Sequence, residues 1–317
     1  MSHPIRVEGL TKDYHISRGV QFNALKDLDF TVKRGEVFGF LGLNGAGKTT
    51  TLKILTTVME ATSGNAWISQ KNIKEEPMEV RKILGFMPEN PGFYPTMSGL
   101  ATLEYFARFY HDKKTSKEKA TTLIEKVGLT AFAQRNVETY SHGMKKRLAL
   151  AASLVNDPEV LILDEPTSGL DPRGINQFKM MIRALGDMGI TVMFSSHALA
   201  DVEEVCDRVL IINKGRLVTI QRVEELRDSF ISKTKEKVVI RVDSPLEDSV
   251  IQLLKGISGV EEVSCDQKSI VVIASAGSRV APEVNFNLAA RGVRVLELKT
   301  ETPPLEKLFL EAVEGLN

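Results

Sequence analysis

The sequence predicts an α/β protein with a largely parallel sheet covered by helices, followed by a smaller α+β domain. Three nearly continuous apolar runs, Val37–Leu41, Val160–Leu163 and Thr191–Phe194, are typical of strands buried on both faces, and helical stretches separate them. The chain has 317 residues, of which 43% are hydrophobic, so it can form a sizeable core and favours two domains over one.

Charge and apolar patterning narrow the class of protein. Lys plus Arg and Asp plus Glu number 41 each, and this neutral balance argues against a nucleic-acid binder, which usually carries a basic excess. The N-terminus lacks the apolar run of a signal peptide, and no window reaches the roughly 18 apolar residues of a membrane helix. We therefore expect a cytoplasmic chain whose two cysteines, Cys206 and Cys265, are buried, reduced thiols.

The expected first domain spans residues 1–226 and contains a β-subdomain and a helical subdomain. Residues from about 95 to 152 are mostly helical in pattern, which predicts a helical insertion into the α/β core. The charge run from Lys113 to Lys119 within it indicates a solvated helix face.

A polar, charged linker is expected at residues 227–237, before a second domain at 238–317. The pattern of that domain is strand, helix, strand, strand, helix, strand, which resembles a small ferredoxin-like domain. A last helix is expected to run from Pro304, as a first-turn proline, to Val313.

A glycine-rich loop follows the first apolar run and precedes a helical stretch from Thr49 to Thr57. Its sequence fits the P-loop pattern G-x-x-x-x-G-K-[ST] in the strand-to-helix context that the pattern requires: Gly42-Leu43-Asn44-Gly45-Ala46-Gly47-Lys48-Thr49. The alternative, a glycine-rich turn with a surface lysine, does not account for the strand before the loop and the helix after it.

This loop predicts a nucleotide site that takes ATP with Mg²⁺. Glycines let backbone N–H groups wrap a phosphate, and the helix that follows offers further N–H groups and the positive end of its dipole. We expect Lys48 to reach the β- and γ-phosphates, Thr49 to ligate Mg²⁺ and Thr50 to help hold the phosphates. The expected binding residues of the loop are Asn44, Gly45, Ala46, Gly47, Lys48, Thr49 and Thr50.

Two carboxylates emerge at the end of the apolar run Val160–Leu163, where open α/β sheets bind their ligands. Asp164 is expected to hold Mg²⁺, directly or through its water shell. Glu165, one residue further along, is expected to face the attacking water and to orient or deprotonate it.

Three more segments resemble motifs of the ATP-binding cassette (ABC) ATPases. Tyr140-Ser141-His142-Gly143-Met144 is similar to the LSGGQ signature and is expected to open a helical stretch from Lys145 to Val155. Residues 166–171 are similar to the D-loop region. His197, after a strand ending in Ser195-Ser196, resembles the switch histidine of the family. Because the order of all five motifs matches, the resemblance spans residues from about 5 to 225.

The resemblance implies a head-to-tail homodimer that encloses two ATP molecules. Ser141 and Gly143 of one chain would cap the γ-phosphate held by the P-loop of the other, Asp171 would lie at the dimer seam, and His197 would help position the water. Tyr14 aligns with the adenine-stacking aromatic of the family, although a lone tyrosine is also common in cores and on surfaces.

Two positions depart from the family pattern. Glu89 stands where a glutamine touches Mg²⁺, so a carboxylate is expected there as a ligand of the metal, at the cost of negative charge beside the triphosphate. His142 stands where a glycine is usual, and it would either crowd the dimer interface or add a donor to the phosphate.

The signature and the residues around Glu89 resemble the branch of bacterial and archaeal exporters of drugs, sodium, lipids or polysaccharide. This implies an ATPase subunit, peripheral on the inner face of the cell membrane, that drives a separate integral membrane permease. Residues Pro91–Pro95 would either contact that permease or form an ordinary loop. The alternatives are a soluble ABC ATPase acting on ribosomes or DNA, which the single cassette and neutral charge disfavour, and a module without catalysis, which the presence of Lys48, Glu165 and His197 disfavours.

Overall fold

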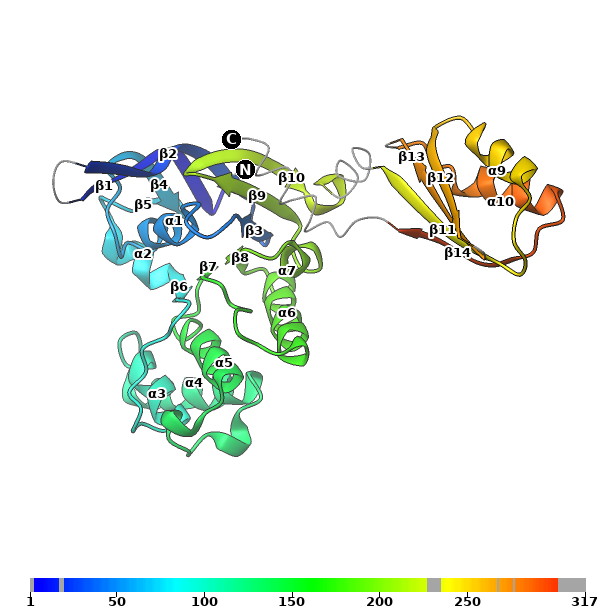
Figure 1. Cartoon of the computed structure of the whole chain (residues 1–317). Helices are drawn as coiled ribbons and strands as arrows, with labels where there is room; N and C mark the ends of the chain where they lie inside the picture. The colour runs from blue at the N-terminus through cyan, green and yellow to red at the C-terminus, as the bar shows by residue number, and fades with distance from the viewer. Residues whose placement is uncertain (1–2, 17–19, 227–234, 267, 276, 302–317) are drawn as a thin grey trace. The chain divides into compact units, whose positions relative to one another are not determined.

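The computed structural model describes residues 3–16, 20–226, 235–266, 268–275 and 277–301. The chain divides into two compact units, Met1–Val223 and Glu224–Asn317, and each unit has a hydrophobic core of its own (Figure 1). Within the described residues, no helix is both long enough and apolar enough to cross a membrane.

A six-stranded sheet in the order β10-β9-β3-β8-β7-β6 forms the centre of the first unit. All strands are parallel except β10, which pairs antiparallel with β9. Every residue of β3, β7 and β8 is buried, as the apolar runs predicted. The bounds are β3 Val37–Leu41, β6 Leu84–Met87, β7 Val160–Leu163, β8 Thr191–Ser196, β9 Arg208–Asn213 and β10 Arg216–Arg222.

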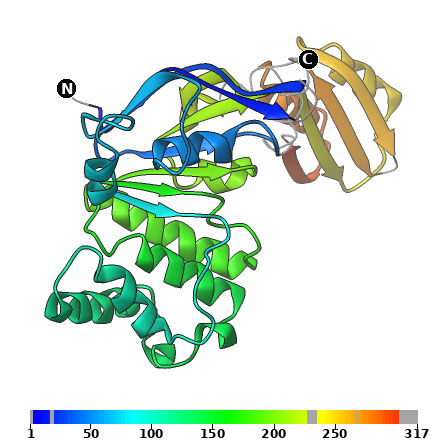
Figure 2. The ribbon, with the colours of Figure 1, turned by 90° about the vertical axis from the view of Figure 1, so that its left-hand side faces the viewer.

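A second, antiparallel sheet has the order β2-β1-β4-β5 and corresponds to the expected β-subdomain. Figure 2 shows α1 between this sheet and the six-stranded sheet, and side chains of both sheets share one core with α1. The bounds are β1 Ile5–Ile16, β2 Val20–Val32, β4 Ser63–Ile68, β5 Lys71–Asn72, α1 Lys48–Leu55 and α2 Pro77–Ile83.

Helices cover the other face of the six-stranded sheet: α6 (Pro172–Asp187) and the short α7 (Leu199–Glu203) both contact β3 and β8. At Gly39 in β3, an added Cβ would lie 2.4 Å from Val202 Cγ1, so the α7 segment packs directly on the strand backbone. The sulfur of Cys206 lies in the same contact, and this cysteine is buried as expected, whereas Cys265 is exposed, so the expectation for it was wrong.

The helical subdomain comprises α3 (Gly99–Ala107), α4 (Lys113–Lys126) and α5 (His142–Ala152), which gather at one end of the first unit (Figure 1). Two 3₁₀ turns, Thr130–Phe132 and Val137–Thr139, connect α4 to α5. Most of the charge run from Lys113 to Lys119 is exposed on α4. The helix α5 begins at His142, three residues before the expected Lys145, because the Ser141 side chain caps it.

The second unit has the predicted order β11-α9-β12-β13-α10-β14 and one antiparallel sheet in the order β12-β13-β11-β14. The strand β11 starts at Glu236, two residues earlier than expected, so the end of the expected linker is strand. The expected helix from Pro304 to Val313 lies outside the described residues. The bounds are β11 Glu236–Val242, α9 Asp248–Lys255, β12 Val260–Asp266, β13 Ser269–Ala274, α10 Ala281–Ala290 and β14 Val295–Glu301.

Candidate functional site

The P-loop lies between β3 and α1, at the carboxyl end of the parallel strands. Gly47 caps α1 with a φ of 111°, and an added Cβ there would lie 2.7 Å from Leu25 Cδ2 and 2.8 Å from the Ala24 carbonyl oxygen. Only glycine suits this position, because both the conformation and the space exclude a side chain. Because no side chain of the described residues caps α1 at Gly47, the N–H groups of its first turn are open to an anion.

A cavity of about 350 Å³ opens over the P-loop. Of the residues that the sequence assigned to nucleotide, Ala46 does not line it, since its side chain is buried in the core. Tyr14 does not line it either, whereas Phe22, an aromatic outside every recognised motif, does. The lining residues are Phe22, Ala24, Leu43, Asn44, Gly45, Gly47, Lys48, Thr49, Thr50, Glu89, Glu165, Ser168 and His197.

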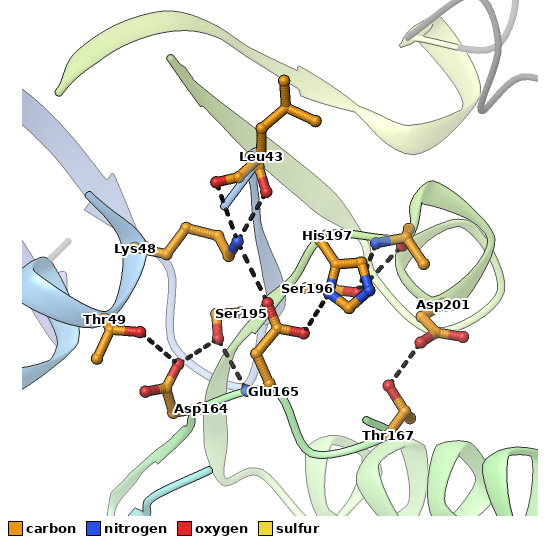
Figure 3. A network of polar contacts seen from close by, with 12 residues as sticks. Leu43, Lys48, Thr49, Asp164, Glu165, Thr167, Ser195, Ser196, His197 and Asp201 are labelled. Carbon is orange, nitrogen blue, oxygen red and sulfur yellow. Dashed lines mark hydrogen bonds and ion pairs between the residues drawn. The ribbon is translucent and has the colours of Figure 1, made fainter. Parts of the chain in front are cut away.

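The carboxylate of Glu165 is held between two cationic or polar groups (Figure 3). One of its oxygens lies 3.2 Å from Lys48 Nζ, and the other lies 2.9 Å from His197 Nδ1. Lys48 also donates to the Gly42 carbonyl oxygen at 2.7 Å. The side chains of Lys48 and Glu165 are more than nine-tenths buried, whereas that of His197 is about half exposed (51%). The structure thus brings the three residues expected to bind and hydrolyse ATP into one contact.

Asp164 forms the second polar group of the site. Its Oδ1 accepts a 2.7 Å hydrogen bond from Ser195 Oγ and lies 3.4 Å from Thr49 Oγ1. Ser195 Oγ in turn accepts from the backbone N–H of Glu165 at 2.9 Å, so this β8 hydroxyl fixes both acidic residues (Figure 3). In the sequence Ser195 is recognisable only as part of the end of a strand, although a hydroxyl on a fully buried strand indicates a buried polar partner.

The oxygen atoms near Thr49 suit Mg²⁺ as ligands. The hydroxyl of Thr49 and the carboxylate of Asp164 are hard oxygen ligands, and the Glu89 carboxylate lines the same cavity. Among the described residues there is no cluster of three or more His, Cys, Asp or Glu that could hold a metal alone. A protein site of one or two oxygen ligands completed by substrate phosphates and water is the usual arrangement for Mg²⁺ with a nucleotide.

The other expected nucleotide residues lie in a different cavity of about 530 Å³ at the amino ends of α5 and α6. Ser141 caps α5 by accepting from the Met144 N–H at 3.3 Å, and Asp171 caps α6 by accepting from the Gly174 N–H at 2.9 Å. Gly143 lies in the first turn of α5 and also lines this cavity. One chain therefore carries two separate sets of candidate nucleotide-binding residues.

His142 contacts its own chain. Its Nε2 lies 3.1 Å from the Ser168 carbonyl oxygen, and an added Cβ at Gly169 would lie 2.9 Å from the same nitrogen. The ring therefore packs against the loop that follows Glu165.

A third cavity, of about 330 Å³, lies beside the segment after Glu89 and is lined by Pro91, Phe93, Phe106, Phe109 and Tyr110, among others. Aromatic rings meet edge to face around it, with centroids 5.3 Å apart for Tyr105 and Phe109 and 6.2 Å apart for Phe93 and Phe106. Phe109 is 68% exposed. Such a group of exposed aromatics is typical of a protein contact surface.

Comparison with known proteins agrees with these motifs. A family model described as ABC transporter matches residues 25–168. The uncharacterized ABC transporter ATP-binding protein YhcH of Bacillus subtilis (strain 168) is 40% identical over 292 residues, which cover 90% of each chain. The bacitracin transport ATP-binding protein BcrA of Bacillus licheniformis is 32% identical over 316 residues, which cover 99% of each chain.

A solved structure shares the fold of the first unit. The dimeric post-hydrolysis state of the ATP-binding cassette MJ0796, bound to ADP and Pi, matches with a TM-score of 0.64 and 22% identity, over 69% of this chain and 98% of that one. Together with the full-length relatives, the P-loop and the acidic end of β7 identify the enzyme class. This chain belongs to the ABC transporter family as an ATP-binding subunit, and it is an ATPase.

Proposed function

We propose that this chain is the ATP-hydrolysing subunit of an exporter and that it drives a separate membrane permease from the inner face of the cell membrane. The observation that carries this proposal is the buried Glu165 carboxylate held between Lys48 and His197. Export is supported by the similarity to BcrA, which is named as a bacitracin transport protein and matches this chain over 99% of its length.

In the proposed mechanism, MgATP lies in the cavity over the P-loop. The triphosphate accepts hydrogen bonds from the first-turn N–H groups of α1 and from Lys48. In the structure, the Lys48 ammonium pairs with Glu165. Thr49 and Asp164, with Glu89 beside them, would hold Mg²⁺, which neutralises charge on the phosphates.

Glu165 then acts as the base or orienting group for water. When Lys48 turns to the phosphates, the Glu165 carboxylate keeps His197 as its partner and has an oxygen open to the attacking water. His197 is half exposed, which suits a group that contacts the γ-phosphate from the rim of the site.

Two chains are proposed to pair head to tail. Ser141 and Gly143 line a different cavity from the one over the P-loop. In this arrangement, the residues of one chain cannot enclose a nucleotide from both sides. The amino end of α5 from a second chain supplies the missing N–H groups, and Asp171 lies at the seam. ATP then stabilises the dimer, and hydrolysis removes the phosphate that joins the chains.

The proposed permease contact is the aromatic cavity beside Pro91–Pro95. An apolar segment of the membrane partner would bury the exposed ring of Phe109 and its neighbours. Phe109→Ser should abolish recovery of the chain with membranes that contain its permease. Met180→Ser is the matched control, because Met180 is 72% exposed on α6 but does not line this cavity.

The mechanism is tested with Glu165→Gln in the full chain. The amide keeps the size of the side chain but is no base, so turnover should fall by roughly 100-fold or more while ATP still binds and a dimer accumulates with MgATP. Lys48→Ala should instead weaken ATP binding itself, since it removes a phosphate contact. Steady-state ATPase, equilibrium ATP binding and light scattering measure the three quantities. Normal turnover of Glu165→Gln would refute the role of Glu165.

A further inference from the structure

The helix α5 carries signature residues at its amino end. One turn further along, the same helix also contacts the loop that carries Glu165. Lys146 lies four residues after His142, so both side chains project from one face of the helix. That face lies against the loop after β7, which carries Glu165 and runs on to Asp171.

Lys146 contacts the main chain of the catalytic residue. Its Nζ donates a 2.8 Å hydrogen bond to the backbone carbonyl oxygen of Glu165, and its side chain is only 1% exposed. Glu165 has a positive φ of 45°, a conformation that a non-glycine residue holds only when its surroundings enforce it. Ser195 accepts from the N–H of Glu165 on one side, and Lys146 donates to its carbonyl on the other.

His142 makes the second contact of the same face. Its Nε2 lies 3.1 Å from the carbonyl oxygen of Ser168, three residues after Glu165. Two side chains one helical turn apart therefore hold two main-chain carbonyls of one short loop. A shift of the amino end of α5 would be transmitted to the loop through both contacts.

A buried lysine also needs compensation for its charge. Burial lowers the pKa of Lys146, and the carboxylates of Glu89, Glu165 and Asp164 oppose that shift by stabilising the ammonium form.

We propose that Lys146 is a positioning residue that holds the main chain of Glu165 in its catalytic conformation and couples it to the signature end of α5. The inference rests on the proposed role of Glu165 as the group that activates water. Lys146 itself contacts neither the P-loop cavity nor the signature cavity. Its loss should therefore change the rate of hydrolysis and leave ATP affinity in place.

The test compares Lys146→Met with Lys145→Met in the full chain. Methionine fills a similar volume without a charge, so the fold should survive, and Lys146→Gln, a shorter neutral donor, is the second variant. We expect Lys146→Met to lower kcat by about 10- to 100-fold, with KM for ATP within about threefold of the unmodified protein, because misplacement of a catalytic group has effects of this size. Lys145→Met removes the same charge from the same helix, and its kcat should stay within about twofold.

Lys146→Gln should likewise lower kcat and keep the KM for ATP. An unchanged kcat in Lys146→Met, or an equal loss in Lys145→Met, would overturn the positioning role.

Glu165→Gln, assayed in parallel, separates this inference from the function on which it rests. If Glu165→Gln loses turnover but Lys146→Met keeps it, only the role of Lys146 fails. If Glu165→Gln keeps normal turnover, the proposed mechanism fails first.

Discussion

At the scale of single residues, the most direct experiment concerns which aromatic side chain at the rim of the P-loop cavity contacts the adenine. Tyr14 and Phe22 lie directly opposite each other in the β1–β2 pair. The hydroxyl of Tyr14 lies 3.1 Å from Met59 Sδ and 3.4 Å from Thr50 Oγ1, whereas Phe22 lines the cavity and is 51% exposed. An open ring face beside the phosphate site suits a purine, so Phe22 is the stronger candidate for adenine stacking.

We expect Phe22→Ala to weaken ATP binding by roughly ten- to a hundredfold, because base–aromatic stacking contributes about 1–3 kcal/mol. Its affinity for inorganic triphosphate should not change, since that ligand has no base. Isothermal titration with both ligands, in the Glu165→Gln background to prevent turnover, measures the difference. Tyr14→Phe, which keeps the ring and removes only the hydroxyl, serves as the comparison. Equal losses for ATP and triphosphate would contradict the stacking role of Phe22.

Residues that act through local motifs could be predicted, and residues that act through tertiary contacts could not. Lys48 could be predicted from its loop and Glu165 from its strand end, because in both cases the neighbouring residues in the sequence define the chemistry. Phe22 reaches the cavity through strand pairing, and Lys146 reaches Glu165 across 19 residues of sequence. In the sequence Lys146 is one of three consecutive cations, a pattern more often found on solvated helix faces.

At the scale of elements, the strands buried on both faces were the most predictable part. The bounds of β3 and β7 agree with the apolar runs because strands buried on both faces consist mainly of apolar residues. Helix ends were less predictable: α5 starts at His142 because the Ser141 side chain supplies the cap. Ser141 can be recognised as the cap only when the chain before the helix is known to be extended.

The packing of α3 against the segment before α5 depends on Gly99. An added Cβ there would lie 2.1 Å from the hydroxyl of Tyr140, which donates a 2.8 Å hydrogen bond to the Phe132 carbonyl oxygen. Burial also raises the pKa of this tyrosine. Tyr140 immediately precedes Ser141, so the same contact fixes the amino end of α5.

Gly99→Ala should therefore destabilise the protein by about 1–3 kcal/mol, the usual effect of overpacking, and should lower Tm by several degrees. Gly92→Ala is the matched control, because an added Cβ at Gly92 meets nothing within 4 Å. Differential scanning calorimetry of both variants measures the effect. Equal Tm values for the two variants would show that the Gly99–Tyr140 contact does not limit stability.

At the scale of the whole molecule, the first unit carries every residue that we assign to nucleotide, and the second unit lies outside that chemistry. The cavities over the P-loop and at the signature are lined only by residues of the first unit. The second unit has its own core, built on β11, β12 and β13 with α9 and α10. We propose that it is an accessory domain that regulates the ATPase or stabilises its dimer.

This assignment is tested by removing residues 235–317. Because the buried core of the first unit contains no residue of the second, the truncated chain should keep its fold and its affinity for ATP. In the Glu165→Gln background we expect its MgATP-bound dimer to dissociate about tenfold more readily, a loss of about 1.4 kcal/mol of association free energy. Analytical ultracentrifugation over a concentration series measures the dimer, and steady-state assays of the truncated chain with Glu165 intact measure the ATPase rate. If the truncated protein keeps the same dimer stability and the same ATPase rate, the second unit has no role in the nucleotide cycle, and any role that it has involves another partner.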